Sequence, residues 1–481
     1  MTKYTEFANV LESQIKEKIL NTGEKLPSLR ELHKSSGLSI STILKSMDYL
    51  IAKGLIKSKE KSGYYVTYDH TLFDQTPIIT KPVGKIDLEE VENLIDQVYL
   101  TPTLSPNEID FSIGVPAKEL LPINKIKKAV IEVMHQSADA ETKYEPIYGN
   151  PDLRRLIAQR SLLAGSNFNL DEIITTSGCM NALTFSLMAI SKPGDTVIVE
   201  SPMFFGVLQL LSSLGLNVIE ANTHSSHGLI LSDLENILHD QNVTAIITVS
   251  NFGAPLGFCM PDQNKKKLVK LANEYDIILV EQDLYGDVFF EKNRPKTCKS
   301  YDTENRVILC SSFSKTLAPG YRVGYVVGAR YTKEIARLKA YHNITSNSLT
   351  HKIVARILET GRYDRYLNYL RKSLEKNLLG YLEYIKKHFP RDIKVSAPKG
   401  GFVLWIELKE GIDTNVLFQK CLGHGIRIAP GRLFSLRNQY RNCFRISYGL
   451  NWTPEVQKSL ITIGKIVTKM YKEKLTPLAP S

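Results

Sequence analysis

The apolar positions of the chain follow two different rhythms. Within residues 1–66 they recur at helical spacing, and the first stripe predicts a helix that ends near residue 21, built on Phe7, Val10, Leu11, Ile15 and Ile19. From about residue 109 to 475, β-rich runs such as TVIVE, TAIITVS and IILVE alternate with helical segments such as NALTFSLMAISK. This alternation predicts a mainly parallel sheet between helix layers, with sites at the carboxyl ends of its strands.

Residues 28–66 predict a helix-turn-helix followed by a wing. Ser28 stands before LRELHK as an N-cap, Glu31 completes a capping box, and Gly37 ends the helix. A third helix opens at Ser39, with an apolar stripe of Ile40, Ile43, Leu44, Met47 and Leu50, and with surface positions at Ser41, Thr42, Lys45 and Ser46. The alternating segment LIKSKEKSGYYV then predicts two strands with a basic tip.

Residues 67–108 predict a linker, with four prolines around one amphipathic stretch, DLEEVENLIDQVYL, that is typical of a single helix. We therefore expect a multidomain chain, with a mostly helical domain at 1–66, a linker at 67–108 and an α/β body at 109–475.

Composition excludes several classes of protein. The 481 residues are 43% hydrophobic and 23% charged, as in ordinary globular proteins, and no apolar run of about 18 residues predicts a membrane span. Six cysteines lie far apart with no CxxC pair, which argues against a metal site and favours the cytoplasm. The net charge of +11 permits an anionic partner, although residues 1–66 hold only 11 Lys and Arg against 7 Asp and Glu.

The side chains of the N-terminal domain suit a DNA major groove. Ser, Thr and Lys at the start of the third helix can reach phosphates and base edges there. The candidate DNA-binding residues are Ser28, Arg30, Ser39, Ser41, Thr42, Lys45, Lys59, Lys61 and Gly63. The alternative is a small protein-interaction module whose charges are only solvated.

The segment CSSFSKTLAPGYRVGY carries the strongest candidate chemistry of the body. It holds Lys315, with Ser312 three positions before it and Arg322 seven after it. A lysine in a desolvated, electropositive pocket loses proton affinity and can form an imine with an aldehyde, while the Arg and the Ser would hold a phosphate. The combination predicts pyridoxal 5′-phosphate as cofactor. The alternative is a surface loop whose Lys315 and Arg322 point to solvent.

Both halves of the chain resemble known families. The N-terminal domain resembles the winged helix-turn-helix of the GntR regulators in the phrases G-x-K-L-P-S-x-R-E-L, S-x-S-T, L-x-x-x-G-L-I and S-G-Y-Y-V. The body resembles the fold-type I, class I/II aminotransferases in their lysine signature, which here reads SFSK-x-x-A-P-G-x-R-x-G. Their order along almost the entire chain resembles the MocR-type regulators. The resemblance implies a pyridoxal-phosphate-dependent transferase fold, with a large part at about 125–345 and a smaller α+β part at about 350–475, in a homodimer.

Further cofactor-binding residues are implied by this resemblance. The turn at Gly178 and Cys179 would cradle the phosphate at a helix N-terminus. Phe204 would stack on the pyridine ring, and Tyr285 would bond its phenolic oxygen. Tyr144 would reach the phosphate of the neighbouring subunit.

The sequence departs from the family pattern at two places. Ala254 stands where the family has an asparagine that donates to the phenolic oxygen. The carboxylate that pairs with the pyridine nitrogen falls on Gln282 if counted three positions before Tyr285, and on Asp283 if counted two. We expect Asp283 there, because a buried carboxylate keeps the ring nitrogen protonated. If Gln282 occupies the position, the body would deprotonate an amino acid poorly and would suit sensing better than catalysis.

The predicted function is that of a transcriptional regulator that binds an operator in double-stranded DNA and senses an amino acid or amine effector by aldimine exchange at Lys315. Arg445 would bind the effector's carboxylate and Gly114 would close over it, as the resemblance implies. The rival hypotheses are a working aminotransferase that carries a DNA-binding head, and a DNA-binding protein whose body only dimerises.

Overall fold

The computed structural model describes residues 3–16, 19–20, 23–52, 55–59, 62–66, 88–100, 108–136 and 143–475. The chain forms two compact units, one of residues 1–75, 372–393 and 452–481, and one of residues 76–371 and 394–451. Among the described helices, none is long and apolar enough to cross a membrane. Lys61 and two stretches of the expected linker, 67–87 and 101–107, lie outside the described residues.

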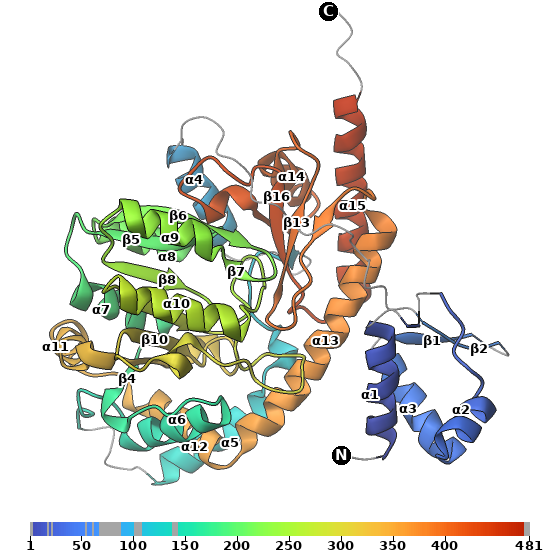
Figure 1. The fold of residues 1–481 in the computed structure, drawn as a ribbon, viewed down its shortest axis with the longest axis horizontal. Coiled ribbons are helices and arrows are strands. Elements are labelled where there is room, and N and C mark those ends of the chain that lie inside the picture. The colour runs from blue at the N-terminus through green and yellow to red at the C-terminus, as the bar shows by residue number, and fades with distance from the viewer. Residues whose placement is uncertain are drawn as a thin grey trace, which may run out of the picture. The chain divides into compact units, whose positions relative to one another are not determined.

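The N-terminal domain is a winged helix-turn-helix, as predicted (Figure 1). Ser28 N donates to Glu31 Oε2 at 2.7 Å and Glu31 N donates to Ser28 Oγ at 3.3 Å, which confirms the capping box. Gly37 ends the second helix with a φ of +68°. The elements are α1 (Lys3–Lys16), α2 (Leu29–Ser36), α3 (Ile40–Ala52), β1 (Ile56–Lys59) and β2 (Gly63–Val66), the two strands being antiparallel. The first helix is described up to residue 16, and residues 19–20 are not helical, so it stops short of the predicted end near residue 21.

The buried face of α3 differs from the predicted stripe. Ile43 and Met47 are fully buried, whereas Ile40 and Leu44 are 44% and 37% exposed. Ser46, which we expected on the surface, is buried, and its hydroxyl donates to the carbonyl oxygen of Tyr4 at 2.8 Å. The buried stripe is rotated toward Ser46 because α1 packs against α3 at this position.

The body is built around an eight-stranded sheet in the order β4-β11-β10-β9-β8-β5-β6-β7. Neighbouring strands pair in parallel from β10 through β6, whereas β11 and β7 pair antiparallel to their neighbours, so the predicted, mainly parallel sheet is confirmed. The strands are β4 (Ile173–Thr176), β5 (Thr196–Ser201), β6 (Asn217–His224), β7 (Gly228–Leu229), β8 (Ala245–Thr248), β9 (Ile278–Asp283), β10 (Val307–Ser312) and β11 (Gly324–Val327).

Helices surround this sheet (Figure 1). The helix α7 packs on the side chains of β9 and β10 that point to its face, among them Val280, Ile308 and Cys310. Because side chains alternate along a strand, the residues between them point to the other face. The helices are α5 (Ile123–Gln136), α6 (Pro151–Leu163), α7 (Cys179–Ile190), α8 (Phe205–Ser213), α9 (Leu231–Asp240), α10 (Asp262–Glu274), α11 (Thr332–Asn343) and α12 (Ser348–Glu359).

The C-terminal part of the chain carries a second, antiparallel sheet of order β12-β13-β16-β15, and β3 pairs with β14. The strand β3 (Ile109–Asp110) comes from an earlier part of the chain. The C-terminal elements are α13 (Arg362–His388), β12 (Lys394–Val395), β13 (Val403–Glu407), α14 (Thr414–Leu422), β14 (Ile426–Arg427), β15 (Ala429–Pro430), β16 (Cys443–Ser447) and α15 (Pro454–Leu475). The amphipathic stretch of the expected linker forms α4 (Leu88–Ile95), followed by a π-helical segment (Asp96–Leu100) that contributes to the site described below.

Candidate functional site

Lys315 lies just beyond the carboxyl end of β10, which stops at Ser312. Its side chain is partly buried, and no hydrogen bond or ion pair joins its amine to another described residue. Burial, together with the guanidinium groups of Arg445 and Arg322, lowers the pKa of Lys315 to about 8. A lysine in this environment is neutral often enough near neutral pH to act as a nucleophile.

Arg322 lies against the turn that begins α7. Its Nη1 donates to Ser314 Oγ at 3.0 Å, and its Nη2 donates to the carbonyl oxygen of Ser177 at 3.3 Å. Gly178, the next residue, has a φ of +93°, and a Cβ there would lie 2.5 Å from Arg322 Nη2. Only glycine therefore allows the guanidinium to lie beside the first N–H groups of α7. This combination of donors is suited to an anion such as a phosphate.

Ser312 is placed differently from our expectation. Its hydroxyl donates to the carbonyl oxygen of Val323 at 3.2 Å and accepts from Ser314 N at 2.9 Å, so both of its hydrogen bonds go to the backbone at the two ends of this loop. Ser314 contacts Arg322 in its place. The sequence shows both Ser312 and Ser314 before Lys315, but only the fold of the turn shows that the hydroxyl of Ser314 is the one that contacts Arg322.

Gln282 and Asp283 end strand β9 on opposite faces of the sheet. Cys179 Sγ lies 3.9 Å from Gln282 Oε1, on the α7 side. The Asp283 carboxylate instead pairs with Arg294 and accepts a hydrogen bond from Asn251 Nδ2 at 3.2 Å. Strand alternation thus directs Asp283, which we expected opposite the pyridine nitrogen, away from the face that carries Cys179.

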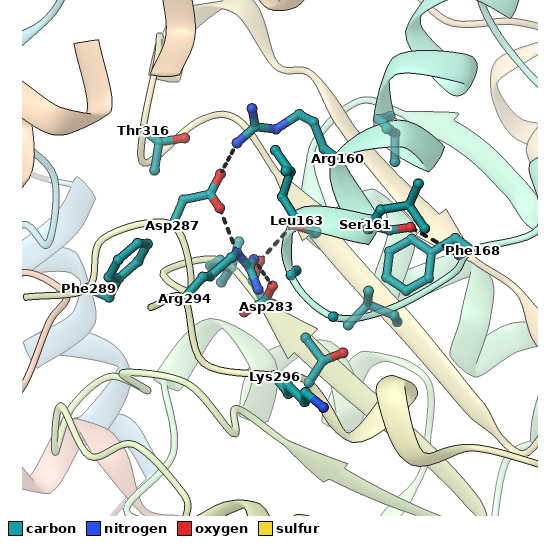
Figure 2. Close-up of a pocket in the computed structure, with 18 of the residues that line it drawn as sticks. Arg160, Ser161, Leu163, Phe168, Asp283, Asp287, Phe289, Arg294, Lys296 and Thr316 are labelled. Atoms are coloured by element: carbon teal, nitrogen blue, oxygen red, sulfur yellow. Dashed lines mark hydrogen bonds and ion pairs between the residues drawn. The ribbon is translucent and has the colours of Figure 1, made fainter. Parts of the chain in front are cut away.

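Asp283 belongs to a buried ion network on this opposite face (Figure 2). Arg294 also pairs with Asp287 at 2.7 Å, and Arg160 lies 3.3 Å from the second oxygen of Asp287. Burial alone would raise the pKa of Asp287, but Arg294 and Arg160 hold it well below its usual range. The network lines a cavity of about 630 Å³, whose lining does not include Lys315. Within the network, Asp283 and Asp287 neutralise the charges of Arg294 and Arg160.

Arg445, on β16, is the second cation near Lys315. Its side chain is 2% exposed, and its Nη2 donates to the carbonyl oxygen of Ser112 and to Tyr99 Oη, the latter at 3.1 Å. Its Nε is buried without a hydrogen-bond partner among the described residues, and no described carboxylate pairs with it. A buried, unpaired guanidinium is costly unless an anion joins it, so Arg445 is suited to a carboxylate. Gly114, two residues beyond Ser112, is buried on the same loop.

Tyr99 is a site residue that the sequence did not reveal. It lies in the π-helical segment within the stretch that we expected to be linker. Its ring stacks on that of Phe205 at 4.2 Å and an interplanar angle of 27°, and burial raises the pKa of its hydroxyl. An aromatic residue at the end of an amphipathic stretch was the only sequence signal, and it is equally typical of simple packing.

The remaining predicted cofactor-binding residues differ in how deeply they are buried and in what they contact. Tyr285 is buried, burial raises its pKa to about 12, and the charge of Arg445 acts on its hydroxyl. Phe204 caps α8 and lies edge-on to Phe205 at 4.6 Å. Tyr144 is 80% exposed, so within a single chain it is not brought into the site. Ala254 is buried and offers no side-chain donor.

The predicted DNA-binding residues whose side chains the structure describes lie at or near the surface of the winged helix-turn-helix. Ser28, Arg30, Ser39, Ser41, Lys45 and Gly63 are exposed, and Thr42 is half-buried. Ser39 Oγ lies 2.8 Å from Thr42 Oγ1 and accepts from Thr42 N at 3.2 Å, so these two side chains also cap α3. Lys59 ends β1, whereas its side chain and all of Lys61 lie outside the described structure.

Comparison with protein families identifies both parts of the chain. Residues 3–66 match the model of the bacterial regulatory proteins of the gntR family. Residues 106–462 match that of the class I and II aminotransferases. The chain is a MocR-type regulator of the GntR family. As in other MocR-type regulators, a DNA-binding head precedes an aminotransferase-like body.

Curated relatives share this whole MocR-type architecture. The chain is 35% identical over 468 residues to the HTH-type transcriptional regulator YjiR of Escherichia coli, covering 97% of this chain and 99% of the relative. It is 33% identical over the same length to YdcR of that organism, with the same coverage. Among solved structures, kynurenine aminotransferase of Pyrococcus horikoshii, crystallised with pyridoxamine phosphate, has a TM-score of 0.73 and 27% identity, covering 81% of this chain and 96% of its own.

Membership of the class I and II aminotransferases implies pyridoxal phosphate as the cofactor of the MocR-type body. The described residues fit this group. Lys315 is an unpaired amine with a lowered pKa, and Arg322 lies over a turn that only glycine can form. Two buried donors near Lys315, Arg445 Nε and Gln282 Nε2, have no partner among the described residues.

Proposed function

We propose that this MocR-type regulator senses an amino compound at Lys315 and transmits its binding to the DNA-binding heads of a homodimer. The observation that carries the proposal is that Lys315 shares its surroundings with Arg322 and Arg445, while no described carboxylate pairs with any of the three. Arg445 is buried without a carboxylate partner, which is costly unless an anion joins it, and the partly buried Lys315 and the exposed Arg322 add positive charge that favours anionic or electrophilic ligands. A phosphate, an aldehyde and an effector carboxylate would supply them.

Each side chain has a separate task under this proposal. Pyridoxal phosphate supplies an aldehyde carbon that forms a double bond to an amine. Arg322 and the turn at Gly178 would hold its phosphate, and Lys315 would hold its aldehyde carbon until the effector's amine takes that place. Arg445 would bind the effector's carboxylate through its fork of donors.

Further residues complete the proposed cofactor site. Ser314, rather than Ser312, would assist Arg322, and Cys179 would contribute the first N–H groups of α7. Phe204 would stack on the ring, and Tyr285 would bond its phenolic oxygen. We reassign the position opposite the ring nitrogen from Asp283 to Gln282, because Gln282 is the residue of β9 on the α7 side.

The proposal also assigns roles to the neighbouring subunit and to the DNA-binding heads. Tyr144, which is 80% exposed, would reach the phosphate of the second chain. Regulation requires that the effector binds two arrangements of the dimer with different affinity, and a nearly complete shift between them takes about 5.5 kcal/mol. The heads would bind operator DNA through Ser28, Arg30, Ser39, Ser41, Thr42, Lys45, Lys59, Lys61 and Gly63.

A titration of the purified full-length protein tests the proposal. We expect a visible absorbance band that Lys315→Ala removes and that Lys333→Ala, which alters an exposed lysine of α11, preserves. A panel of common amino acids and simple amines should contain a compound that shifts the band once and changes affinity for a DNA duplex selected from a random pool. Survival of the band in Lys315→Ala, or the absence of any responsive amine, would overturn the proposal.

The rival hypothesis is a working aminotransferase with a DNA-binding head. A steady-state assay with the responsive amino compound and a 2-oxo acid separates the two. Rapid multiple turnover would support the enzyme, whereas one spectral change without turnover would support the sensor.

A further inference from the structure

The end of β9 presents a neutral amide, and not a carboxylate, toward the site of Lys315. Gln282 is 2% exposed and its Oε1 lies 3.9 Å from Cys179 Sγ, at the N-terminus of α7. Asp283 is 3% exposed on the other face, where Arg294 and Asn251 occupy its carboxylate. Exchanging the two side chains would require the strand to slip by one residue, which its parallel register with β8 and β10 prevents.

The amide of Gln282 has a free donor. Its Nε2 is buried and has no hydrogen-bond partner among the described residues. Leaving a buried N–H without an acceptor costs about 1–3 kcal/mol, so the position is complete only when an acceptor joins it. A pyridine nitrogen accepts a hydrogen bond through its lone pair, and it can do so only while it carries no proton.

The charged groups around the site also affect whether the ring nitrogen carries a proton. With Lys315 bound to the aldehyde carbon and Arg322 paired with the phosphate, Arg445 is the remaining positive charge near the ring, and it disfavours a further cation on the ring nitrogen. Burial raises the pKa of the Cys179 thiol well above its usual value, so this neighbour stays neutral. Burial likewise raises the pKa of Tyr285 to about 12, so its hydroxyl stays neutral too. The negative charge of Asp283 acts on Cys179 in the opposite sense to a positive charge, but Arg294 pairs with this carboxylate on the other face of the sheet.

We infer that Gln282 holds the cofactor's ring nitrogen without a proton, and that this restricts the body to exchanging one amine for another. The inference rests on the proposed function and makes it more specific. In the exchange, the effector's nitrogen replaces Lys315 Nζ on the aldehyde carbon. The effector gives up two protons, Lys315 takes up two and leaves as a free amine, and no oxidation occurs. Removing the effector's α-proton would instead require the electron sink that a protonated ring provides.

Nitrogen-15 NMR of the full-length protein, loaded with cofactor enriched at the ring nitrogen, tests this inference without measuring activity. We expect the wild type to show the resonance of an unprotonated pyridine from pH 6 to 9, and Gln282→Asp to show that of a pyridinium. Asp283→Asn is the matched control, and it should leave the resonance unchanged because this side chain faces Arg294. A pyridinium resonance in the wild type, or a shift caused by Asp283→Asn alone, would overturn the inference.

A single-turnover reaction with the responsive amino acid gives a second readout. Gln282→Asp should convert it to a 2-oxo acid at least tenfold faster than the wild type. Equal rates in the two proteins would contradict the inference. This failure differs from a failure of the proposed function, in which the wild type would bind no cofactor or would not respond to any amine.

Discussion

Thr316, the residue that follows Lys315, shares a hydrogen bond of 2.6 Å with the hydroxyl of Tyr363. That hydroxyl also lies 3.0 Å from Asp287 Oδ2, so the loop of Lys315 is bonded to the ion network on the opposite face of the sheet. Figure 2 shows Thr316 and Asp287 beside the same cavity. The ion network therefore supports the loop of Lys315. The arginines of the network are already paired with its own aspartates.

Tyr363→Phe should weaken this support. The ring of Tyr363 is 1% exposed and would stay packed, but Thr316 and Asp287 would each lose a partner. We expect the free energy of unfolding of the body to fall by about 1–3 kcal/mol, measured by denaturant titration. Tyr341→Phe, at a tyrosine that is 74% exposed, is the control and should have no effect. If Tyr363→Phe and Tyr341→Phe unfolded at the same denaturant concentration, the hydrogen bonds of Tyr363 would not support the loop of Lys315.

The rate at which the cofactor-free protein captures pyridoxal phosphate should depend on pH through Lys315. Its pKa is lowered to about 8, and only the neutral amine forms the bond. The rate should therefore rise with pH and level off above about pH 8, whereas an ordinary lysine would level off near pH 10.4. Arg445→Ala should move this midpoint upward because it removes a positive neighbour. Stopped-flow absorbance measures both effects, and a midpoint above pH 10 in the wild type would contradict the assignment.

Arg445→Lys should weaken the response to effectors that carry a carboxylate. Lysine keeps the charge but loses the fork of donors that binds two oxygens at once. We expect the concentration needed for half of the spectral shift to rise about tenfold to a hundredfold, in line with the loss of a charged hydrogen bond. An amine without a carboxylate serves as the control ligand and should respond as before. A uniform loss for both ligands would place Arg445 outside the carboxylate site.

Gly178→Ala should lower affinity for the cofactor through its phosphate. The added Cβ would lie 2.5 Å from Arg322 Nη2, and alanine rarely adopts a φ of +93°. We expect at least a tenfold higher dissociation constant for pyridoxal phosphate, with little change for phosphate-free pyridoxal. Gly320→Ala is the control, since a Cβ there meets no atom within 4 Å. Equal losses for both aldehydes would instead indicate general damage to the site.

Arg30→Ala and Lys45→Ala should each reduce the salt dependence of DNA binding. Both side chains are exposed on the helix-turn-helix. Each lost phosphate contact removes about one unit from the slope of log affinity against log salt concentration. Fluorescence anisotropy with a selected duplex measures the slope, and Lys333→Ala, in the body, should leave it unchanged. Slopes that match the wild type would exclude these two residues from the interface.

Local patterns were sufficient to predict the architecture of this chain. The capping box of Ser28 and Glu31 depends on residues three positions apart, and the mainly parallel sheet follows from the alternation of strand and helix segments. Helix caps and strand runs are decided by neighbours in sequence, so these predictions survive in the fold. The segment around Lys315 was informative for the same reason, because its spacing to Arg322 is short.

Only the tertiary structure decided which side chains meet. Tyr99 joins Arg445 across more than three hundred residues, Ser46 is buried because α1 packs on it, and Gln282 rather than Asp283 faces Cys179. These outcomes depend on strand alternation and on helix packing, which bring together positions far apart in the chain. Sequence by itself therefore determined the winged helix-turn-helix, the mainly parallel sheet and the position of Lys315 after a strand, because these depend on local patterns. The side chain that β9 presents to Cys179 was decided by the tertiary structure, because it depends on which face of the sheet each residue occupies.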